Sequence, residues 1–469
     1  MGRGLIVIHV DGLSHANLQR AVAAGQMPFV GRLLADAGYE ALPYRCGVPS
    51  TTPFAQAGIL YGDNDEIPSY RWWDKERDLL VAFGSGATFH KVAGKYFQGR
   101  EPLTRGGCCI AALYAAGDQD RFGPAYEERH TDANRKVILP FLTDPVTLYY
   151  WIRHGGRSVA MITGAYVKAR LRGRRAAGNY VIADLYHEVV VHHLTRFALL
   201  QAIGEGLPVI YACYYTFDEA AHAFGPEHPE SLRILRHVDH TIRLAVRRAR
   251  DRYEVVVLSD HGQVETEPFL RKDGRRLGEI LAGWLPGQQV QEFKGGRFGP
   301  ENPSAGRVVI TYSGGLGHVY FRDLPGRLQA PDIDSRYPGL VQRLAALERI
   351  GFVLLRDGDQ DVYVTGEGRL ADPRQLLAGL DDPEVIGAQL HRLNSFQRSG
   401  DLVVFGRYRD GRQVNFENQV GGHGSAGGEQ LHPFLLARRE CGLDTSAVAS
   451  AEELHPLLTS LRDRLAAAS

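Results

Sequence analysis

The sequence is poor in cysteine and lacks the cysteine spacings that hold small or extracellular domains together. Its 469 residues include five cysteines, an odd number, and no two of them have Cys-x-x-Cys spacing. A disulfide framework or a cysteine-based zinc ribbon is therefore disfavoured. Such sparse cysteine fits a reducing compartment, and we predict a cytoplasmic protein.

The chain also lacks an excess of charge and a long apolar run. Lys plus Arg number 54, as do Asp plus Glu, so the overall charge predicts neither a nucleic-acid polymer nor an anionic membrane as partner. No stretch approaches the ~18 apolar residues of a membrane span. The run Leu5–Ile8 is too short for a signal sequence. We interpret the local basic stretch from Lys168 to Arg175 as a solvated face.

Alternating strands and helices predict the fold class. Short apolar runs predict strands buried on both faces at 4–10, 158–162, 209–214 and 255–258. Helical spacing predicts helices at 15–37 with a break at Pro28, and at 144–154, 183–203 and 229–250. This alternation is typical of an α/β fold, with a mostly parallel sheet covered by helices on both faces.

The composition changes after about residue 265, where short β-rich segments with Gly and Asp turns replace the alternation. We predict an inserted α+β cap or substrate subdomain at 266–415, with hairpin turns at 357–359 and 409–412. A smaller insertion, rich in glycine and aromatic residues, is predicted at about 66–135. The core would comprise 1–265 and 416–469 and end in an amphipathic helix.

Potential metal ligands stand at several places, most of them directly after a predicted strand. In an open α/β sheet, side chains at the carboxyl ends of the strands share one crevice. Asp and His oxygen and nitrogen atoms suit Zn²⁺ or Mn²⁺. Each residue alone also fits a helix cap, a solvated turn or a chance surface pair, so the prediction depends on their combination. The residues are Asp11, Asp218, His222, Asp260, His261 and His423.

A hydroxyl-rich segment, Pro49-Ser50-Thr51-Thr52-Pro53, supplies a possible nucleophile. Pro53 favours the first turn of a helix. A hydroxyl at that position lies near backbone N–H groups and the positive end of the helix dipole, which stabilise anions. Thr52 fits a helix N-cap equally well, so the segment alone does not choose between the two roles, nor between Thr52 and its neighbours Thr51 and Ser50.

The order and spacing of these motifs resemble the type I phosphodiesterase/nucleotide pyrophosphatase family of the alkaline phosphatase superfamily. The segment Asp218–Pro226 is similar to the family's Asp-x-x-x-His-x-x-Gly-Pro, and Ser259–Gly262 to its Ser-Asp-His-Gly. Gly422–Gly424 resembles its x-His-Gly, and Asp11 stands where the family places its first metal ligand. Pro49–Thr52, with Gly62 ten residues beyond Thr52, resembles the Pro-Thr-x-Thr nucleophile segment.

The resemblance implies an alkaline phosphatase-like three-layer α/β/α sandwich and two divalent metal ions, Zn²⁺ with Mn²⁺ as the alternative. It places one metal on Asp11, Thr52, Asp260 and His261, and the other on Asp218, His222 and His423. A metal beside Thr52 would favour its alkoxide. Attack on a phosphate ester would then give a covalent threonyl-phosphate intermediate, which water hydrolyses.

Two departures from the family pattern bear on the substrate. The family usually carries Asn three residues after the nucleophile, where it contacts a phosphate oxygen, and here that position is Ala55. Gln56 is the possible substitute, so the substrate need not be a nucleotide. Cys46–Ser50 is weakly similar to the sulfatase motif Cys-x-Pro-Ser-Arg, but it has one residue too many and no Arg, which disfavours a sulfatase.

The leading prediction is a phosphodiesterase-type hydrolase acting on a small phosphate ester. A phosphomonoesterase on the same site, a metal-dependent phosphomutase and a non-catalytic binding protein of the same fold are the alternatives. All seven expected positions are filled, which disfavours the binding protein. Trp72 and Trp73 fit a substrate pocket or a small core equally well, and His318 is interpreted as structural. The oligomeric state is left open.

Overall fold

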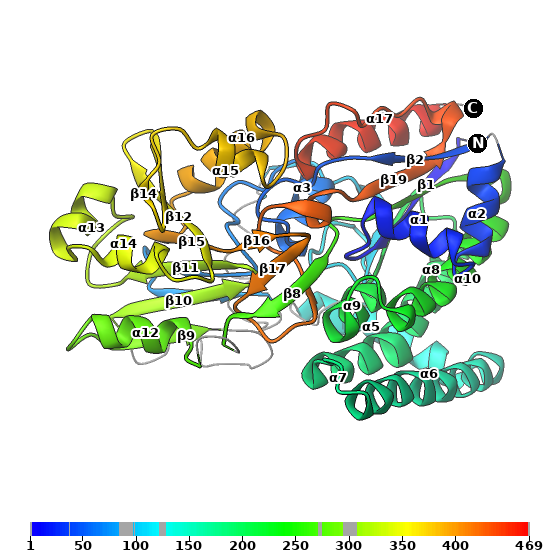
Figure 1. Ribbon diagram of the computed structural model, residues 1–469. Coiled ribbons are helices and arrows are strands. Elements are labelled where there is room, and N and C mark those ends of the chain that lie inside the picture. The colour runs from blue at the N-terminus through cyan, green and yellow to red at the C-terminus, as the bar shows by residue number, and fades with distance from the viewer. Residues whose placement is uncertain are drawn as a thin grey trace.

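The computed structural model describes the chain over residues 2–36, 38–83, 97, 99–121, 128–270, 274–293 and 307–467. A six-stranded sheet lies beside the two chain ends, and a seven-stranded sheet occupies the opposite end of the molecule (Figure 1). A four-stranded sheet and a two-stranded ribbon complete the β-structure of these residues. Within the same residues, no helix has both the length and the apolar content that crossing a membrane requires.

The six-stranded sheet confirms three of the four predicted buried strands. Its order is β2 (Tyr39–Pro43), β19 (Phe434–Arg438), β7 (Tyr253–Leu258), β1 (Gly4–Val10), β6 (Val209–Tyr214) and β5 (Cys108–Ile110). The four strands β7, β1, β6 and β5 are mutually parallel. Strand β19 runs antiparallel to both of its neighbours, β2 and β7. The sheet is therefore mostly parallel, as the sequence predicts.

Both faces of this sheet are buried, which explains why its strands read as continuous apolar runs. Leu5 and Val7 pack on one face, with helices α3 (Thr52–Tyr61) and α17 (Leu454–Ala467). Ile6 and Ile8 pack on the other face, with α1 (His15–Ala23), α2 (Pro28–Ala35), α8 (His192–Glu205) and α10 (Pro229–Ala249). The three-layer α/β/α sandwich is thus confirmed, as is the break at Pro28.

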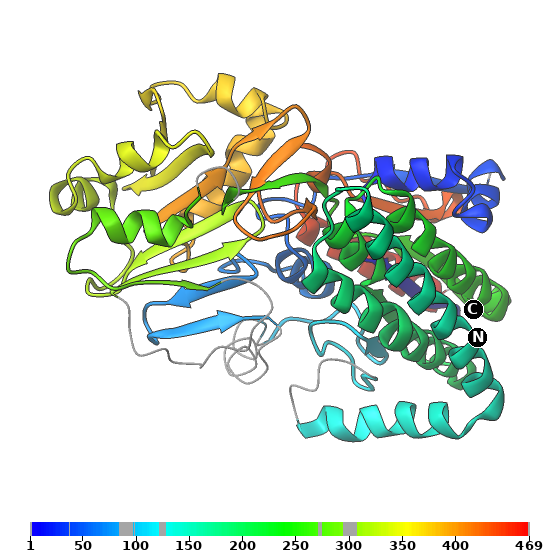
Figure 2. The same cartoon turned by 60° about the horizontal axis from the view of Figure 1, so that its bottom comes forward.

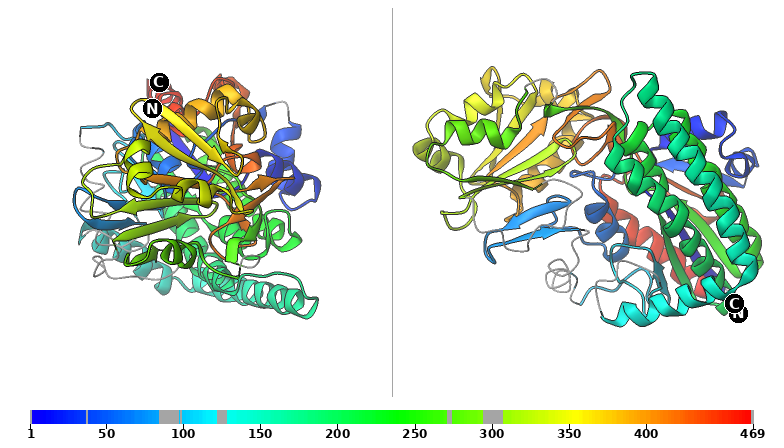
Figure 3. Two further views of the ribbon diagram at one scale, coloured as in Figure 1. Left: turned by 60° about the vertical axis from the view of Figure 1, so that its left-hand side comes forward. Right: turned by 90° about the horizontal axis from the view of Figure 1, so that it is seen from below.

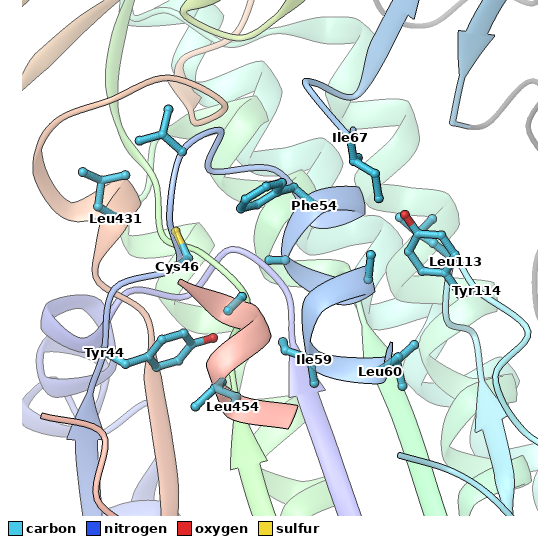
Figure 4. Packing of buried hydrophobic residues seen from close by; sticks show 14 of the residues in the cluster. Tyr44, Cys46, Phe54, Ile59, Leu60, Ile67, Leu113, Tyr114, Leu431 and Leu454 are labelled. Carbon is cyan, nitrogen blue, oxygen red and sulfur yellow. The ribbon is translucent and has the colours of Figure 1, made fainter. Parts of the chain in front are cut away.

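Helix α3 is held tightly between the sheet and the C-terminal segment. Phe54, Ile59 and Leu60 pack among Leu454, Tyr114 and other buried side chains (Figure 4). A Cβ atom at Gly58 would meet the backbone nitrogen of Glu452 at 2.6 Å, so only glycine allows this approach. The start of α3 is consequently fixed in position relative to the strand ends.

The predicted strand at 158–162 is wrong, because these residues lie inside the long helix α6 (Pro145–Leu171). A short apolar run does not distinguish a strand from a buried helix segment. Here Ser158, Ile162, Ala165 and Ala169 are buried at helical spacing. The surrounding elements are α5 (Glu128–Thr143), α7 (Gly178–Tyr186) and a π-helical turn (His187–Val191) that joins α7 to α8.

The seven-stranded sheet has the order β14 (Gly368–Arg369), β13 (Gln360–Thr365), β12 (Ile350–Asp357), β15 (Leu402–Gly406), β11 (Leu316–Phe321), β10 (Val308–Ser313) and β9 (Val290–Phe293). Only the pair β9 and β10 is parallel. One face packs on α12 (Leu277–Trp284), α13 (Ala330–Arg336) and α14 (Leu340–Ala345). The other packs on α15 (Arg374–Ala378) and α16 (Pro383–Ser395).

A four-stranded sheet lies between the two large sheets (Figure 1). In it β8 (Val264–Pro268) pairs with β17 (Arg412–Asn415) and β18 (Gly421–Gly422), and β17 also pairs with β16 (Tyr408–Arg409). Both predicted hairpin turns are confirmed. The boundaries of an inserted subdomain at 266–415 and of the insertion at 66–135, part of which lies outside the described residues, stay predictions.

The two tryptophans lie in the two-stranded ribbon of β3 (Arg71–Asp74) and β4 (Leu79–Ala82). Trp72 and Trp73 are both fully buried in the hydrophobic core. The two tryptophans are therefore core residues, and they belong to the large cluster that also holds Leu5 and Phe405 rather than to a small core of the insertion.

Candidate active site

The predicted ligands converge at the carboxyl edge of the six-stranded sheet. Asp11 follows β1, and Asp260 and His261 follow β7. Helix α9 (Thr216–Phe224) follows β6 and carries Asp218 and His222, whereas the last ligand, His423, follows β18. Parallel strands end at the same edge, so Asp11 and His261, 250 positions apart in sequence, meet there, and β18 of the four-stranded sheet brings His423 to the same place.

Thr52 lies among the first group of ligands. Its Oγ1 atom is 3.4 Å from Asp11 Oδ1 and 3.2 Å from His261 Nε2. His261 Nε2 is in turn 3.5 Å from Asp11 Oδ1 and 3.4 Å from Asp260 Oδ2. All four residues are buried. The four side chains predicted for one metal therefore point toward one another.

The second group adjoins the first. His222 Nε2 lies 3.0 Å from Asp218 Oδ2, and His423 Nε2 lies 3.6 Å from Asp218 Oδ1. The ligand atoms of Asp11, Asp218 and His261, which belong to different groups, also lie within 4.8 Å of one another. The rings of His261 and His423 stack at 3.8 Å. The two groups thus form one continuous cluster.

Backbone carbonyls orient the three imidazoles. The Nδ1 atoms of His222, His261 and His423 face Gly421 O, Gly262 O and Ser50 O at 3.0, 3.0 and 2.8 Å. In the neutral rings, an Nδ1–H group that donates to a carbonyl leaves the Nε2 lone pair free. Each Nε2 atom faces the carboxylates, which is the arrangement of metal-ligating histidines.

The donor set fits a divalent cation. It consists of carboxylate oxygens, imidazole nitrogens and one hydroxyl, as Zn²⁺ and Mn²⁺ sites require. Asp260 Oδ2 is buried and accepts no hydrogen bond from the residues that the structure describes. A buried carboxylate oxygen that accepts no hydrogen bond is costly unless a cation balances it. The cluster is therefore able to hold metal.

Electrostatics support the same interpretation. Burial and the nearby charges of Asp260 and Asp218 raise the pKa of Asp11 well above its ordinary value. Burial also acts to raise the pKa of Asp218, but the charges of His222 and His423 lower it well below the ordinary range. Carboxylates crowded in this way repel one another, and a bound divalent cation removes that repulsion.

The comparisons with known proteins agree with this geometry. The family model of type I phosphodiesterase/nucleotide pyrophosphatase matches residues 5–285, more than half of the chain. The chain belongs to this family. It is accordingly a metal-dependent phosphoric ester hydrolase. A search of curated proteins finds no match.

Solved structures share the fold. Phosphonoacetate hydrolase from Sinorhizobium meliloti 1021, in complex with phosphonoformate, has a TM-score of 0.52 at 15% sequence identity, covering 98% of this chain and 96% of that chain. Murine ectonucleotide pyrophosphatase/phosphodiesterase 5 has a TM-score of 0.49 at 12% identity, covering 98% and 95%. The similarity to phosphonoacetate hydrolase supports an alkaline phosphatase-like architecture for this chain.

The geometry separates Thr52 from the two other hydroxyls of its segment. Ser50 Oγ is within hydrogen-bonding distance of two acceptors, Ser425 O at 3.0 Å and Gln430 Oε1 at 3.1 Å. Thr51 is the N-cap residue of α3, and its buried hydroxyl has no hydrogen-bond partner within the described part of the chain. Only Thr52 presents its hydroxyl to the ligand cluster, so the N-cap interpretation of Thr52 is wrong.

Gln56 does not replace the family's asparagine. Its Oε1 accepts a hydrogen bond of 2.6 Å from the backbone N–H of Leu113, and its Nε2 lies 3.4 Å from His9 Nδ1. The side chain is fully buried. Both ends of the amide therefore form contacts inside the core. Gln56 is not available to contact a phosphate oxygen in place of the asparagine that Ala55 replaces.

Two neighbours of the ligands escaped the sequence analysis. His9 Nε2 lies 3.0 Å from Asp260 Oδ1, and Tyr211 OH lies 2.8 Å from His9 Nδ1. Gln263 Nε2 donates to Asp218 Oδ1 at 2.5 Å. A lone histidine in the apolar strand 4–10, two residues before Asp11 and so on the same strand face, was an available sign. No sequence pattern indicates Gln263.

Replacing His9 with Phe is expected to weaken metal binding about tenfold, because Asp260 loses the ring that orients it. The measurement is competition between the protein and a chromogenic chelator for Zn²⁺. Tyr211→Phe, which removes only the hydroxyl behind His9, is the matched control and should change the affinity less. Unchanged affinity in His9→Phe would show that Asp260 is positioned without it.

Metal affinity is expected to rise with pH until about pH 9. Burial lowers the pKa of His222, but the charge and hydrogen bond of Asp218 raise it to about 9 in the metal-free protein. Below that pH the ring carries a proton that metal must displace, so binding releases a proton and strengthens as pH increases. Calorimetry in buffers of different ionisation enthalpy would count the released protons, and a pH-independent affinity would contradict the prediction.

Proposed function

We propose that this hydrolase cleaves phosphodiesters with two divalent metal ions and a covalent threonyl phosphate on Thr52. The observation that carries the proposal is the position of Thr52 Oγ1, which lies 3.2 Å from His261 Nε2 and 3.4 Å from Asp11 Oδ1. Asp11, Asp260 and His261 would hold one ion beside Thr52. Asp218, His222 and His423 would hold the other.

The roles of the residues follow from this placement. Bound cations supply positive charge that lowers the pKa of a neighbouring hydroxyl and offsets charge on phosphoryl oxygens. Thr52, fixed at the start of α3, would lose its proton to solvent and attack the phosphorus in line with the leaving oxygen. The P–O ester bond then breaks, and the alcohol leaves with a proton from solvent. Water later cleaves the threonyl phosphate and restores Thr52.

The contacts of two arginines favour a diester over a monoester. Arg45 precedes the nucleophile segment in sequence, and Arg71 follows it. A monoester carries one more negative charge, which arginine commonly binds. Arg45 Nε instead pairs with Asp381 at 2.7 Å, and Arg71 pairs with Glu417 at 3.2 Å. Both guanidinium groups are thus committed to carboxylates of the chain, in line with a substrate of lower charge.

The test compares bis-p-nitrophenyl phosphate with p-nitrophenyl phosphate, using metal-stripped protein with Zn²⁺ or Mn²⁺ added back. Faster, metal-dependent cleavage of the diester supports the proposal, and preference for the monoester supports the phosphomonoesterase instead. Acid quenching during turnover, followed by mass spectrometry of the peptide containing Thr52, would detect the phosphothreonine. Turnover without this adduct would replace the covalent mechanism with direct attack by water.

A further inference from the structure

Exposed large apolar side chains are concentrated in one part of the molecule. Eleven of the twelve found among the described residues lie between positions 139 and 186, on α5, α6 and α7, and the twelfth is Leu270. Leu171 is 83% exposed, and Ile152 is 63% exposed. Such a concentration on a soluble surface marks a site of interaction.

Helix α6 is apolar on both of its sides. Its inner side packs on the protein through Ser158, Ile162 and Ala165. Its outer side, here called the α6 face, crosses the outside of the molecule without another described element over it (Figures 2 and 3). A surface helix normally presents a polar outer side to water. The α6 face instead presents Tyr149, Ile152, Val159, Val167 and Leu171, all exposed.

The centre of the α6 face is hollowed by small residues. Gly156, Ala160 and Gly164 follow one another at four-residue spacing. A Cβ atom at Gly156 or Gly164 would meet nothing within 4 Å. Val159, Val167 and Leu171 line a groove of about 550 Å³ beside them. The surface therefore has apolar walls and an open floor.

The charge of the segment that contains α6 is predominantly positive. Residues 135–174 contain eight Lys and Arg and a single acid, Asp144, although the whole chain has equal numbers of both charges. Asp144 is half-buried and caps the start of α6 by accepting from Thr147 N–H. No carboxylate of the described residues forms an ion pair with Arg153, Arg157, Lys168 or Arg170, and α6 itself contains no acid.

This charge pattern indicates which kind of partner the α6 face binds. A second copy of the chain would bring the same cations together, and like charges across an interface oppose association. A protein partner usually offers hydrogen bonds across a mixed polar rim, whereas the α6 face offers an apolar stripe flanked by Arg and Lys. That combination is the one by which helices lie in the interface of anionic membranes.

We propose that the protein binds the surface of membranes containing anionic lipids through the α6 face. Helix α6, about 40 Å long at 1.5 Å per residue, would lie in the plane of the membrane with its inner side still packed on the protein. Tyr149, Ile152 and Leu171 would enter the acyl boundary. The long stems of Arg153 and Arg157 would let their charged ends reach lipid phosphates.

The test is flotation of the full-length protein with phosphatidylcholine vesicles, with and without phosphatidylglycerol. We expect binding only when phosphatidylglycerol is present, and its loss at high salt. Arg153→Gln with Arg157→Gln should weaken binding about 30-fold. The control is Arg247→Gln with Arg248→Gln on α10, where no described large apolar side chain is exposed. It should leave binding within about twofold.

A second pair of variants tests the contribution of apolar side chains to vesicle binding. Leu171→Ser should weaken vesicle binding about tenfold, whereas Leu270→Ser, which removes an exposed leucine outside the 139–186 segment, should not. Both substitutions lie at exposed positions, and thermal unfolding checks that each variant folds. Equal weakening by the two variants would overturn the assignment to the α6 face.

Three results would overturn the proposal as a whole. If the wild-type protein did not float with anionic vesicles, it would have no membrane-binding surface. Dimerisation in sedimentation velocity that Leu171→Ser abolishes would assign the α6 face to a second copy. Preferential binding of polyglutamate over the vesicles would assign it to an acidic protein. None of these readouts depends on hydrolysis, so the proposal stands or falls separately from the proposed function.

Discussion

Thr52→Ala is expected to lower kcat for bis-p-nitrophenyl phosphate by about 10⁴-fold or more, as loss of a nucleophile does in other covalent hydrolases. Metal content should remain close to that of the wild type, because Asp11, Asp260 and His261 stay in place. Kinetics and elemental analysis of the same preparations provide the measurement. Thr52→Ser, which restores a hydroxyl at this position, should recover part of the activity.

Thr51→Ala is the matched control for Thr52→Ala. It removes a neighbouring threonine hydroxyl that is equally buried but has no partner within the described chain. Removal of a hydroxyl without a hydrogen bond costs little, so activity should change less than about threefold. If the two alanine variants lost activity equally, the nucleophile would have to be sought elsewhere in the cluster.

Asp218→Asn is expected to release one of the two proposed metal ions and to lower kcat by about 10³-fold. Asp218 faces both His222 at 3.0 Å and His423 at 3.6 Å, so it is the one carboxylate of the second group. An amide supplies the same shape without the charge that balances a cation. The measurement is metal content after dialysis, together with diester hydrolysis.

Glu219→Gln provides the comparison for Asp218→Asn on the same helix. Burial and the charge of Asp218 raise the pKa of Glu219 to about 7, yet its carboxylate belongs to none of the ligand groups in the described residues. This variant should keep both ions and most of its activity. Retention of both ions by Asp218→Asn as well would contradict the division of the ligands into two groups.

Much of the fold was predictable because burial on both faces leaves a direct trace in sequence. The runs at 4–10, 209–214 and 255–258 became β1, β6 and β7. The predicted strand at 158–162 was wrong because a short, mostly apolar run fits a strand or a helix, and only the packing of Ile162 and Ala165 on the protein decided for α6. The predicted cytoplasmic location stays a prediction.

The ligand cluster was predictable for a different reason. Asp11, Asp218 and Asp260 each follow a strand, and parallel strands bring such positions to one edge whatever their separation in sequence. His9 and Gln263 were missed because their roles depend on contacts with Asp260 and Asp218 across neighbouring elements. The assignment of Gln56 failed similarly, since its partner Leu113 is distant in sequence.

The sequence by itself indicated three strands of the sheet, the residues of the candidate metal cluster and the family, because apolar periodicity and motif spacing are local properties. Tertiary structure alone decided which of three hydroxyls faces the ligands, what holds Asp260, and that α6 keeps an uncovered apolar side. The positive charge of residues 135–174, eight Lys and Arg against one acid, is already present in the sequence, and the fold places it beside that apolar side. Orientation and exposure arise only when distant segments pack together, so a linear pattern does not contain them.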